Sequence, residues 1–400
     1  MNTPRFRAVI LFPENISCYK VPMTEVDITI VGAGVIGLAI ARELSSGTGQ
    51  VVVLEREAGP GMGISSRNSE VVHAGIYYPT GSLKARLCVE GSRMLSSFCP
   101  RFGVPFSRIG KVIVASCPGE ASTVEALHRQ GVENGAEGLT LISGKELAKQ
   151  EPHVSGDCAL LSPHTGIVDT HRLTRTLEAH CLGQGVSILY RTGLSGIEKK
   201  PSGYLCRAEG PGGSSYRFFS RVVINAAGLD GDKLAQLAGI DPDEAGYRIF
   251  PLKGEYFRVS GSKSSLVNGL VYPVPERNLA GLGIHATKDL AGSLRLGPNT
   301  LPADSSGYDV DPSHAPAFYE SARVLLPFLE PDDLCPDMAG IRPKIQKPGG
   351  PARDFVICHE DGRGLPGMVT LAGIESPGLT SCLAIASSVK SLLKGAGLTR

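Results

Sequence analysis

Three residues of this chain combine a reactive side chain with surroundings that favour its use. His73 and His285 have apolar or glycine neighbours rather than charged ones, and a neutral imidazole is a natural general base near physiological pH. Arg342, in the sequence Gly-Ile-Arg-Pro-Lys, has the planar guanidinium that binds a carboxylate through two parallel hydrogen bonds. Each also has a plainer explanation, because hydrogen-bonded histidines are common inside proteins and Arg342 could be a surface arginine after a turn.

Lys253 and Tyr256 form a second pair of candidates, three residues apart. In a regular strand their side chains would point to opposite faces, so both can reach one ligand only if the strand bends at Gly254. Lys253 could bind the distal carboxylate of a diacid, or it could be a solvated lysine at the end of a strand.

A glycine-rich turn with the pattern G-x-G-x-x-G begins at Gly32 and connects a β-branched strand at 26–31 to a helix expected over 35–46. Gly32 allows a tight turn, Gly34 lets a pyrophosphate approach the backbone, and Gly37 lets the helix pack closely on the strand. The first helical turn offers free N–H groups and the positive end of the helix dipole to phosphate.

The next strand, at 51–54, ends at Glu55, eighteen residues after Gly37. At this spacing a carboxylate accepts hydrogen bonds from an adenosine ribose, and it would repel a 2′-phosphate. FAD or NAD is therefore favoured over NADP. A glycine turn alone is weak evidence in a chain with 50 glycines, and an ordinary βαβ unit is the alternative, but the strand, the helix and the acid agree on a dinucleotide site.

The loop over 61–69 is too polar for a core and too long for a simple turn. Its hydroxyls and backbone amides could donate hydrogen bonds to a pyrophosphate or a flavin ring, the alternative being a solvated connection.

Two domains are expected, because the 400 residues exceed what one core usually holds. The apolar strand and helix at 221–228 and 232–238 repeat the pattern of the first βαβ unit, and a last strand and helix at 368–373 and 381–393 return to it, which makes the dinucleotide domain discontinuous. The rest is typical of α+β structure, including an antiparallel meander. Its expected strands lie at 111–115, 187–190, 204–209, 216–219, 255–259, 270–272 and 293–296, and its expected helices at 82–98, 120–134, 170–182 and 316–326.

The composition is that of a globular protein, with 42% hydrophobic residues, 20% charged residues and a net charge of +1. This balance gives no reason to expect nucleic acid, and no apolar run is long enough for a membrane span. The ten cysteines lack zinc-ligand spacing, so we expect no metal and a reducing, cytoplasmic compartment. Residues 1–23 are interpreted as an extension upstream of a start at Met23, with a weak targeting segment as the alternative.

The glycine turn, Glu55-Arg56 and the segment 68–78 together resemble the FAD-dependent D-amino-acid-oxidase superfamily, and most closely its L-2-hydroxyglutarate dehydrogenase/oxidase branch. The likeness covers about residues 24–393, although some members carry Arg at the position of Lys253 and the stretch between Asn299 and Ala339 is shorter than the family pattern. Further matching segments are 79–91, 251–257, 283–285, 296–299 and 339–342.

The resemblance implies FAD as the cofactor, with His73 in the segment beneath the flavin as base or as a covalent attachment point. The loop 376–380 could stabilise the reduced ring through its N–H groups and the dipole of the last helix, the alternative being a helix simply capped by Thr380. The implied cofactor contacts are Gly32, Gly34, Val35, Ile36, Gly37, Glu55, Arg56, Ser66, Asn68, His73, Leu194, Ala227, Gly228, Arg342, Pro377, Gly378, Leu379 and Thr380.

The resemblance also implies the architecture, α/β plus α+β, in which a discontinuous Rossmann-type FAD-binding domain is combined with an antiparallel-sheet substrate domain. We assign residues 24–104, 154–230 and 340–400 to the FAD-binding domain, and residues 105–153 and 231–339 to the substrate domain.

The implied reaction is oxidation of a small L-2-hydroxy acid, with L-2-hydroxyglutarate as the lead substrate. The base would be His73 or His285, and Lys253, Tyr256 and Arg342 would bind the substrate. The electron acceptor would be oxygen or a quinone, which leaves open peripheral contact with a respiratory membrane or a mitochondrial location. The alternatives are an FAD-dependent amine or amino-acid oxidase or dehydrogenase, and a flavin-binding regulatory protein without turnover.

Overall fold

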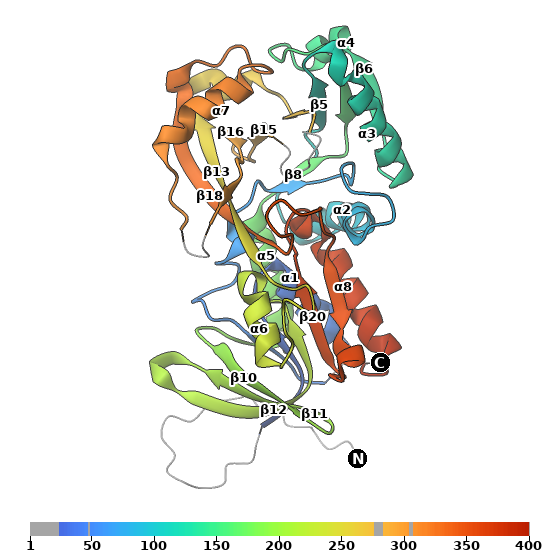
Figure 1. Cartoon of the computed structure of the whole chain (residues 1–400), viewed down its shortest axis with the longest axis vertical. Helices are drawn as coiled ribbons and strands as arrows, with labels where there is room; N and C mark the ends of the chain where they lie inside the picture. Colours follow the sequence, from blue (N-terminus) through green and yellow to red (C-terminus); the bar gives the residue numbers. More distant parts are fainter. Residues whose placement is uncertain (1–23, 47–48, 276–282, 304–306, 400) are drawn as a thin grey trace.

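The computed structural model describes residues 24–46, 49–275, 283–303 and 307–399. Two parts follow one another along the long axis of the molecule, with the dinucleotide-type part below and a second part above (Figure 1). The expected N-terminal extension, residues 1–23, lies outside the described residues.

The lower part contains an eight-stranded sheet in the order β10-β11-β12-β1-β2-β9, with β20 paired to β12 and β19 to β20. The strands are β1 (Thr24–Val31), β2 (Val51–Leu54), β9 (Ser187–Leu189), β10 (Gly193–Lys200), β11 (Gly203–Glu209), β12 (Ser215–Asn225), β19 (Val356–His359) and β20 (Met368–Ala372). Strands β1, β2, β9, β12 and β20 form its parallel core, as a dinucleotide fold requires.

Two strand predictions need correction. The segments 216–219 and 221–228 were expected as separate strands, but they form the single strand β12, which pairs antiparallel with β11 and parallel with β1 and β20. The segment 187–190 was expected in the meander, but β9 pairs parallel with β2. Strand pairing depends on tertiary contacts, which short apolar runs do not encode.

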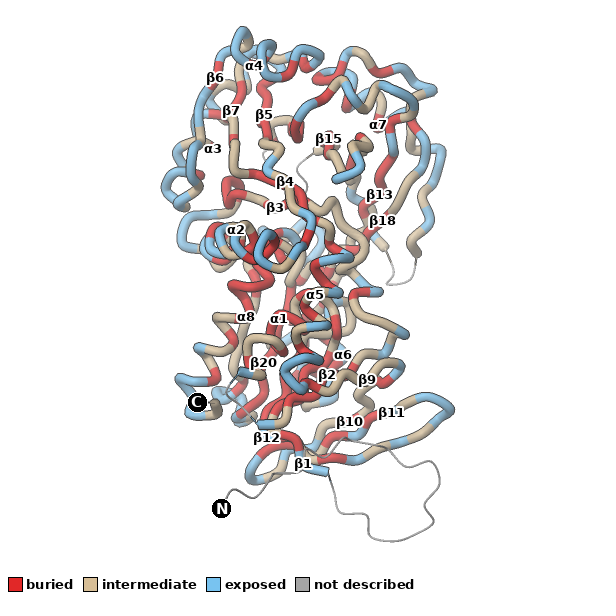
Figure 2. The backbone as a smooth tube through the Cα atoms, turned by 180° about the vertical axis from the view of Figure 1, so that it is seen from behind, coloured by how far each residue is buried: buried red, intermediate tan, exposed pale blue. Residues whose placement is uncertain are grey.

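Helices α1 (Val35–Ser45), α2 (Leu83–Phe102), α5 (Thr170–Gly183) and α8 (Gly378–Gly395) share one apolar core with one face of this sheet. Helix α8 contacts both α1 and α2, and small buried residues on it, Ala384 and Ala386 among them, allow this close packing. Figure 2 shows the buried backbone concentrated where these helices meet the sheet, whereas the β10–β11 hairpin projects into solvent.

The upper part contains a nine-stranded, mostly antiparallel sheet in the order β17-β13-β16-β15-β14-β5-β7-β6, with β18 paired to β13. Its strands are β5 (Lys111–Ala115), β6 (Thr140–Ser143), β7 (Cys158–Ser162), β13 (Phe250–Val259), β14 (Leu270–Pro273), β15 (His285–Lys288), β16 (Leu294–Gly297), β17 (Leu301–Pro302) and β18 (Leu334–Lys344), and its helices are α3 (Ala121–Glu133), α4 (Gly144–Gln150) and α7 (Ala315–Ala322). Within this part, strands β6, β7, β15, β17 and β18 and helix α4 were not predicted; β18 contains two prolines and no clear alternation.

A third, small sheet of β3 (Val71–Val72), β8 (Gly166–Val168) and β4 (Phe106–Ser107) lies between the two parts. The domain boundaries remain predictions. Two elements pack against the part of the molecule to which they were not assigned. Helix α6 (Gly231–Leu237) contacts β20 of the lower sheet, whereas β7 pairs with β5 and β6 of the upper one.

Candidate active site

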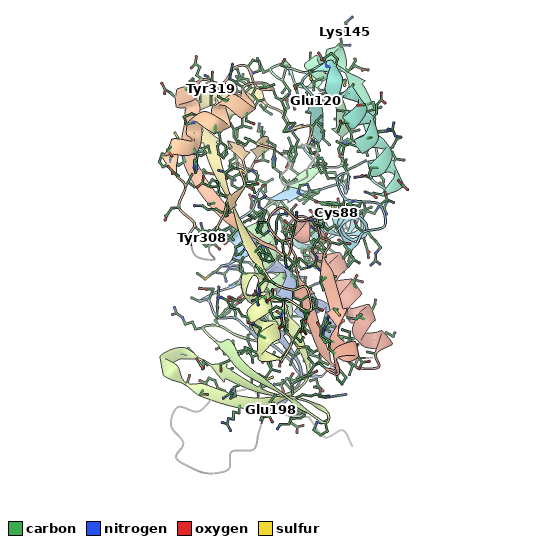
Figure 3. The ribbon with its side chains drawn as sticks, viewed as in Figure 1. Cys88, Glu120, Lys145, Glu198, Tyr308 and Tyr319 are labelled. Atoms are coloured by element: carbon green, nitrogen blue, oxygen red, sulfur yellow. The ribbon has the colours of Figure 1, made fainter. Side chains whose placement is uncertain are left out.

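A cavity of about 1610 Å³ lies between the two parts and is lined by residues of both. It extends from the glycine turn after β1 to the inner strands of the upper sheet. Tyr308, at the waist of the molecule in Figure 3, lines it, whereas the labelled Glu120, Lys145 and Glu198 lie towards the two ends, away from it. Such an enclosed space between domains is the usual place for a cofactor and a small substrate.

The glycine turn has the backbone that a phosphate site requires. Gly32 has a φ of +107°, and a Cβ there would lie 2.5 Å from the carbonyl oxygen of Ala226. A Cβ at Gly37 would overlap with the carbonyl oxygen of Gly32. The N-cap of α1 is Gly34, which has no side chain to cap the helix, and no acid lies in the first turn. The first turn of α1 therefore keeps N–H groups that can donate to an anion.

The polar loop after β2 contributes Ser65 rather than the predicted Ser66. Ser65 Oγ accepts a hydrogen bond from the N–H of Val35 at 2.9 Å, and Ser65 lines the cavity. Ser66 instead donates to the carbonyl oxygen of Gly63 and is not part of the lining. Asn68 lines the cavity and stabilises the loop by donating to the carbonyl oxygen of Ser65. Adjacent serines in a polar loop give no sequence signal for which one points inward.

Glu55 lines the cavity at the end of β2, as predicted. One carboxylate oxygen accepts from the N–H of Ala33 at 2.7 Å and the other from the N–H of Glu57 at 2.9 Å. These bonds fix the carboxylate beside the glycine turn, where a ribose would lie. Arg56 also lines the cavity, but its guanidinium pairs with Asp230 and Glu57 at the surface.

Residues after β12 and at the start of β10 lie on another side of the same cavity. Leu194, Ala227 and Gly228 all contribute to its lining. The fold therefore brings predicted cofactor contacts together in one cavity, although Gly32 and Gly228 are nearly 200 positions apart in the sequence.

The last helix begins earlier than predicted and is not capped by Thr380. Helix α8 starts at Gly378, its N-cap is Pro377, and among the described residues its first turn has no side-chain cap and no acid. Thr380 lies within the helix, where its hydroxyl accepts from the N–H of His73 at 3.0 Å and donates to the carbonyl oxygen of Val71 at 3.3 Å. Thr380 thus joins the His73 segment to α8 and leaves the N-terminus of α8 open.

His73 and His285 both line the cavity. The Nε2 atom of His73 lies 3.4 Å from the hydroxyl of Ser376, and its buried Nδ1 has no hydrogen-bond partner among the described residues. Burial, with the positive charge of Lys111 and the neighbouring His285, holds the pKa of His73 well below its ordinary value. His73 is therefore neutral at physiological pH.

His285 has a defined hydrogen-bonding state. Its Nδ1 lies 3.0 Å from the carbonyl oxygen of Gly283, an acceptor, so Nδ1 must be the protonated nitrogen and Nε2 has the free lone pair. The ring stacks on Tyr272 with centroids 3.9 Å apart. Burial lowers the pKa of His285 to about 3, and the charges of Lys111 and Arg342 act in the same direction. The arrangement presents a neutral imidazole with one basic nitrogen.

Arg342 lies on β18 and lines the cavity. Its Nη2 donates to the carbonyl oxygens of Asn299 at 2.7 Å and Lys253 at 3.3 Å. In the part of the chain that the structure describes, its Nε and Nη1 have no hydrogen-bond partner. The guanidinium is thus held in place on one side and retains donors for a carboxylate.

Lys253 and Tyr256 do not meet in the cavity. Strand β13 is regular at Gly254, with its bulge between Tyr256 and Phe257, so the bend that would bring the two together is absent. Tyr256 lines the cavity, and its hydroxyl lies 2.7 Å from that of Ser69. Lys253 is outside the lining, where its ammonium lies 3.3 Å from the buried Glu255.

Two other lysines do line the cavity. Lys344, two residues after Arg342 on β18, and Lys84 on α2 lie 3.2 and 2.9 Å from one carboxylate oxygen of Glu375. Burial alone would raise the pKa of Glu375, but the two ammonium groups hold it below its ordinary value. Two cations against one anion leave this wall of the cavity net positive.

These features fit an adenine dinucleotide. The cavity has a turn that side chains would obstruct, two long helices with open N-termini, and a carboxylate at the end of β2. The N-terminus of α1 would bind pyrophosphate, and that of α8 would stabilise negative charge on a flavin ring. Within the described ranges no cluster of His, Cys, Asp and Glu could hold a metal ion, and no helix is long and apolar enough to cross a membrane.

Comparison with known proteins agrees with this geometry. The model of the DAO family, described as FAD dependent oxidoreductase, matches residues 27–392. The mitochondrial L-2-hydroxyglutarate dehydrogenase of Arabidopsis thaliana is 38% identical over 91% of this chain and 82% of its own, and that of Caenorhabditis elegans 32% identical over 93% and 94%. The FAD-bound L-alpha-glycerophosphate oxidase of Mycoplasma pneumoniae is 27% identical, with a TM-score of 0.83 over 93% of this chain and 95% of that chain.

Proposed function

The chain belongs to the FAD dependent oxidoreductase family, and we propose that it is an FAD-dependent dehydrogenase that oxidises L-2-hydroxyglutarate to 2-oxoglutarate. The observation that supports this most strongly is the meeting of neutral histidines and an anchored arginine in the same cavity as the dinucleotide site. A protein that only binds flavin has no need of a base and a carboxylate site. Dehydrogenases with this substrate in their names resemble most of the chain, which does not favour the amine-oxidase alternative.

Bound FAD would accept the hydride that leaves C2 of the substrate. We propose that Arg342 binds the C1 carboxylate through N–H groups that its contacts with Lys253 and Asn299 leave free. His285 Nε2 then accepts the hydroxyl proton, since its other nitrogen donates to Gly283. A dianionic substrate next to His285 raises the pKa of the imidazole, because nearby negative charge favours the protonated form. The base thus becomes stronger when substrate is bound.

The distal carboxylate is assigned to Lys344. Arg342 and Lys344 are two positions apart on β18, so their side chains share a face of the strand and are separated by roughly 6–7 Å of backbone. This spacing matches the two ends of a five-carbon diacid. Lys253, which the sequence suggests for this role, lies outside the cavity lining and pairs with Glu255.

Lys344→Met is expected to raise the KM for L-2-hydroxyglutarate by about 10- to 100-fold, because the variant loses one partly buried charged hydrogen bond to the substrate. The KM for a monoacid such as L-2-hydroxybutyrate should change little, since it has no distal carboxylate. Steady-state kinetics on both substrates measures this ratio. Lys253→Met is the matched control and should leave both constants near wild type; a larger effect there than at Lys344 would return the distal site to Lys253.

The proposed function is tested by adding L-2-hydroxyglutarate to the purified yellow protein under anaerobic conditions. Loss of the flavin absorbance is the expected result, with D-2-hydroxyglutarate leaving the colour unchanged. Bleaching by glycine or a D-amino acid would establish the amine-oxidase alternative. A protein that binds FAD but is bleached by none of these acids would be the regulatory flavoprotein.

The electron acceptor and the compartment are part of the proposal. We retain oxygen or a quinone as acceptor. The names of the A. thaliana and C. elegans relatives describe those proteins as mitochondrial, which supports the mitochondrial alternative over the expected cytoplasmic location.

A further inference from the structure

Lys111 is a buried lysine that the proposed mechanism does not use. It lies on β5 with only 1% of its surface exposed, and among the described residues its ammonium contacts aromatic rings rather than a carboxylate. Lysine is almost never buried unless it is paired, since removing the charge from water costs several kcal/mol. A residue that stays in such a place therefore needs an explanation.

Aromatic rings take the place of a carboxylate partner. The Lys111 ammonium lies 4.5 Å from the ring centre of Tyr77 and 4.8 Å from that of Tyr272. These two rings are nearly parallel, with centroids 6.5 Å apart, and Tyr272 stacks on His285 in turn. Tyr77, Tyr272 and His285 all line the cavity, whereas Lys111 does not. The cation thus lies directly behind the wall that presents the candidate base.

The charges around this wall are few. From α2, Cys88 faces Lys111, and its thiol contacts the carbonyl oxygen of His73 at 3.5 Å. From β18, Arg342 acts on His285 and lowers its pKa in the same direction as Lys111. The positive charge of Lys111 lowers the pKa of both His73 and His285.

We propose that Lys111 is a positioning residue that orients His285 through the Tyr77–Tyr272 stack and places a positive charge behind both histidines, which adds to the effect of their burial in disfavouring protonation. The kinetic part of this proposal rests on the proposed function, whereas the orientation of the rings does not. Cation–π contact fixes the tyrosine rings, and ring stacking fixes the imidazole.

The orientation is tested on the wild-type protein, without turnover. Burial lowers the pKa of Lys111 to about 7, so raising the pH through neutrality removes its charge. The proposal expects the ¹³C-labelled ring signals of Tyr77, Tyr272 and His285, assigned with Tyr77→Phe, Tyr272→Phe and His285→Gln, to move together with one midpoint. Signals that do not move, or that move at unrelated midpoints, would overturn it.

The charge is tested by comparing Lys111→Met with Lys111→Arg, both checked for bound FAD by absorbance. In Lys111→Met the acid limb of the kcat/KM profile should move to higher pH by about one unit or more, because a repelling cation has been removed. Lys111→Arg should keep the wild-type limb. If both variants lose activity equally and the acid limb of the kcat/KM profile does not move, Lys111 only fills space. Absence of wild-type turnover would instead reject the proposed function and leave the ring titration as the test.

Discussion

Arg342→Met is expected to raise the KM for L-2-hydroxyglutarate by about 30- to 3000-fold, the range that corresponds to losing roughly 2–5 kcal/mol from a desolvated, hydrogen-bonded charge pair. Methionine retains an unbranched apolar stem but none of the donors. The bonds from Nη2 to Asn299 and Lys253 are lost as well, so the kcat should also fall, because the substrate is held less firmly. Anaerobic stopped-flow reduction of the flavin at increasing substrate concentration separates the two constants.

Arg342→Lys is the informative control for this prediction. Lysine restores the charge but not the planar fork, so the variant should recover only part of the affinity. Absorbance spectra must show FAD still bound in both variants. An unchanged KM in Arg342→Met would remove Arg342 from the substrate site, and full recovery in Arg342→Lys would show that a point charge is sufficient.

The dinucleotide half of the site could be predicted because its signal is local. Gly32, Gly37 and Glu55 belong to one βαβ unit, so the turn, the helix terminus and the acid are brought together by neighbours in sequence. The backbone of Gly32 and the overlap that a side chain at Gly37 would cause are the physical reasons for the motif. The predicted bounds of β1, α1 and β2 accordingly agree with the structure to within two residues at every end.

The substrate half depended on tertiary pairing that one sequence does not encode. Strand β18 pairs with β13 along its whole length, but its own sequence has no strand pattern, so the shared face of Arg342 and Lys344 could not be seen. The sequence indicates Lys111 only as the first residue of an apolar strand, whereas in the structure its ammonium contacts Tyr77 and Tyr272, which are distant in the chain. The sequence predicts Thr380 in the loop that opens the last helix, with capping as the alternative, yet Thr380 lies within α8 and its hydroxyl bonds to the His73 segment.

His285→Gln is expected to lower kcat by about 10²- to 10⁴-fold, the usual contribution of a positioned general base. Glutamine approximates the size of the ring and can keep a hydrogen bond to Gly283, but it cannot accept the proton. The pKa of His285 lies far below its ordinary value in the free protein, so activity should persist as the pH falls below 6.5 and disappear only near the lowered pKa. The acid limb of kcat should lie at higher pH than that of kcat/KM, because the bound dianion raises the pKa of the base.

His73→Gln distinguishes the two histidines. His73 has no carbonyl that defines its tautomer, and its Nε2 lies near Ser376 at the N-terminus of α8. Its replacement should therefore affect flavin binding or the flavin spectrum more than the acid limb of the pH profile. If the acid limb of the pH profile instead disappears in His73→Gln and is retained in His285→Gln, the hydroxyl proton of the substrate is accepted by His73. The stack of Lys111, Tyr272 and His285 would then orient a residue that contacts the substrate without taking its proton.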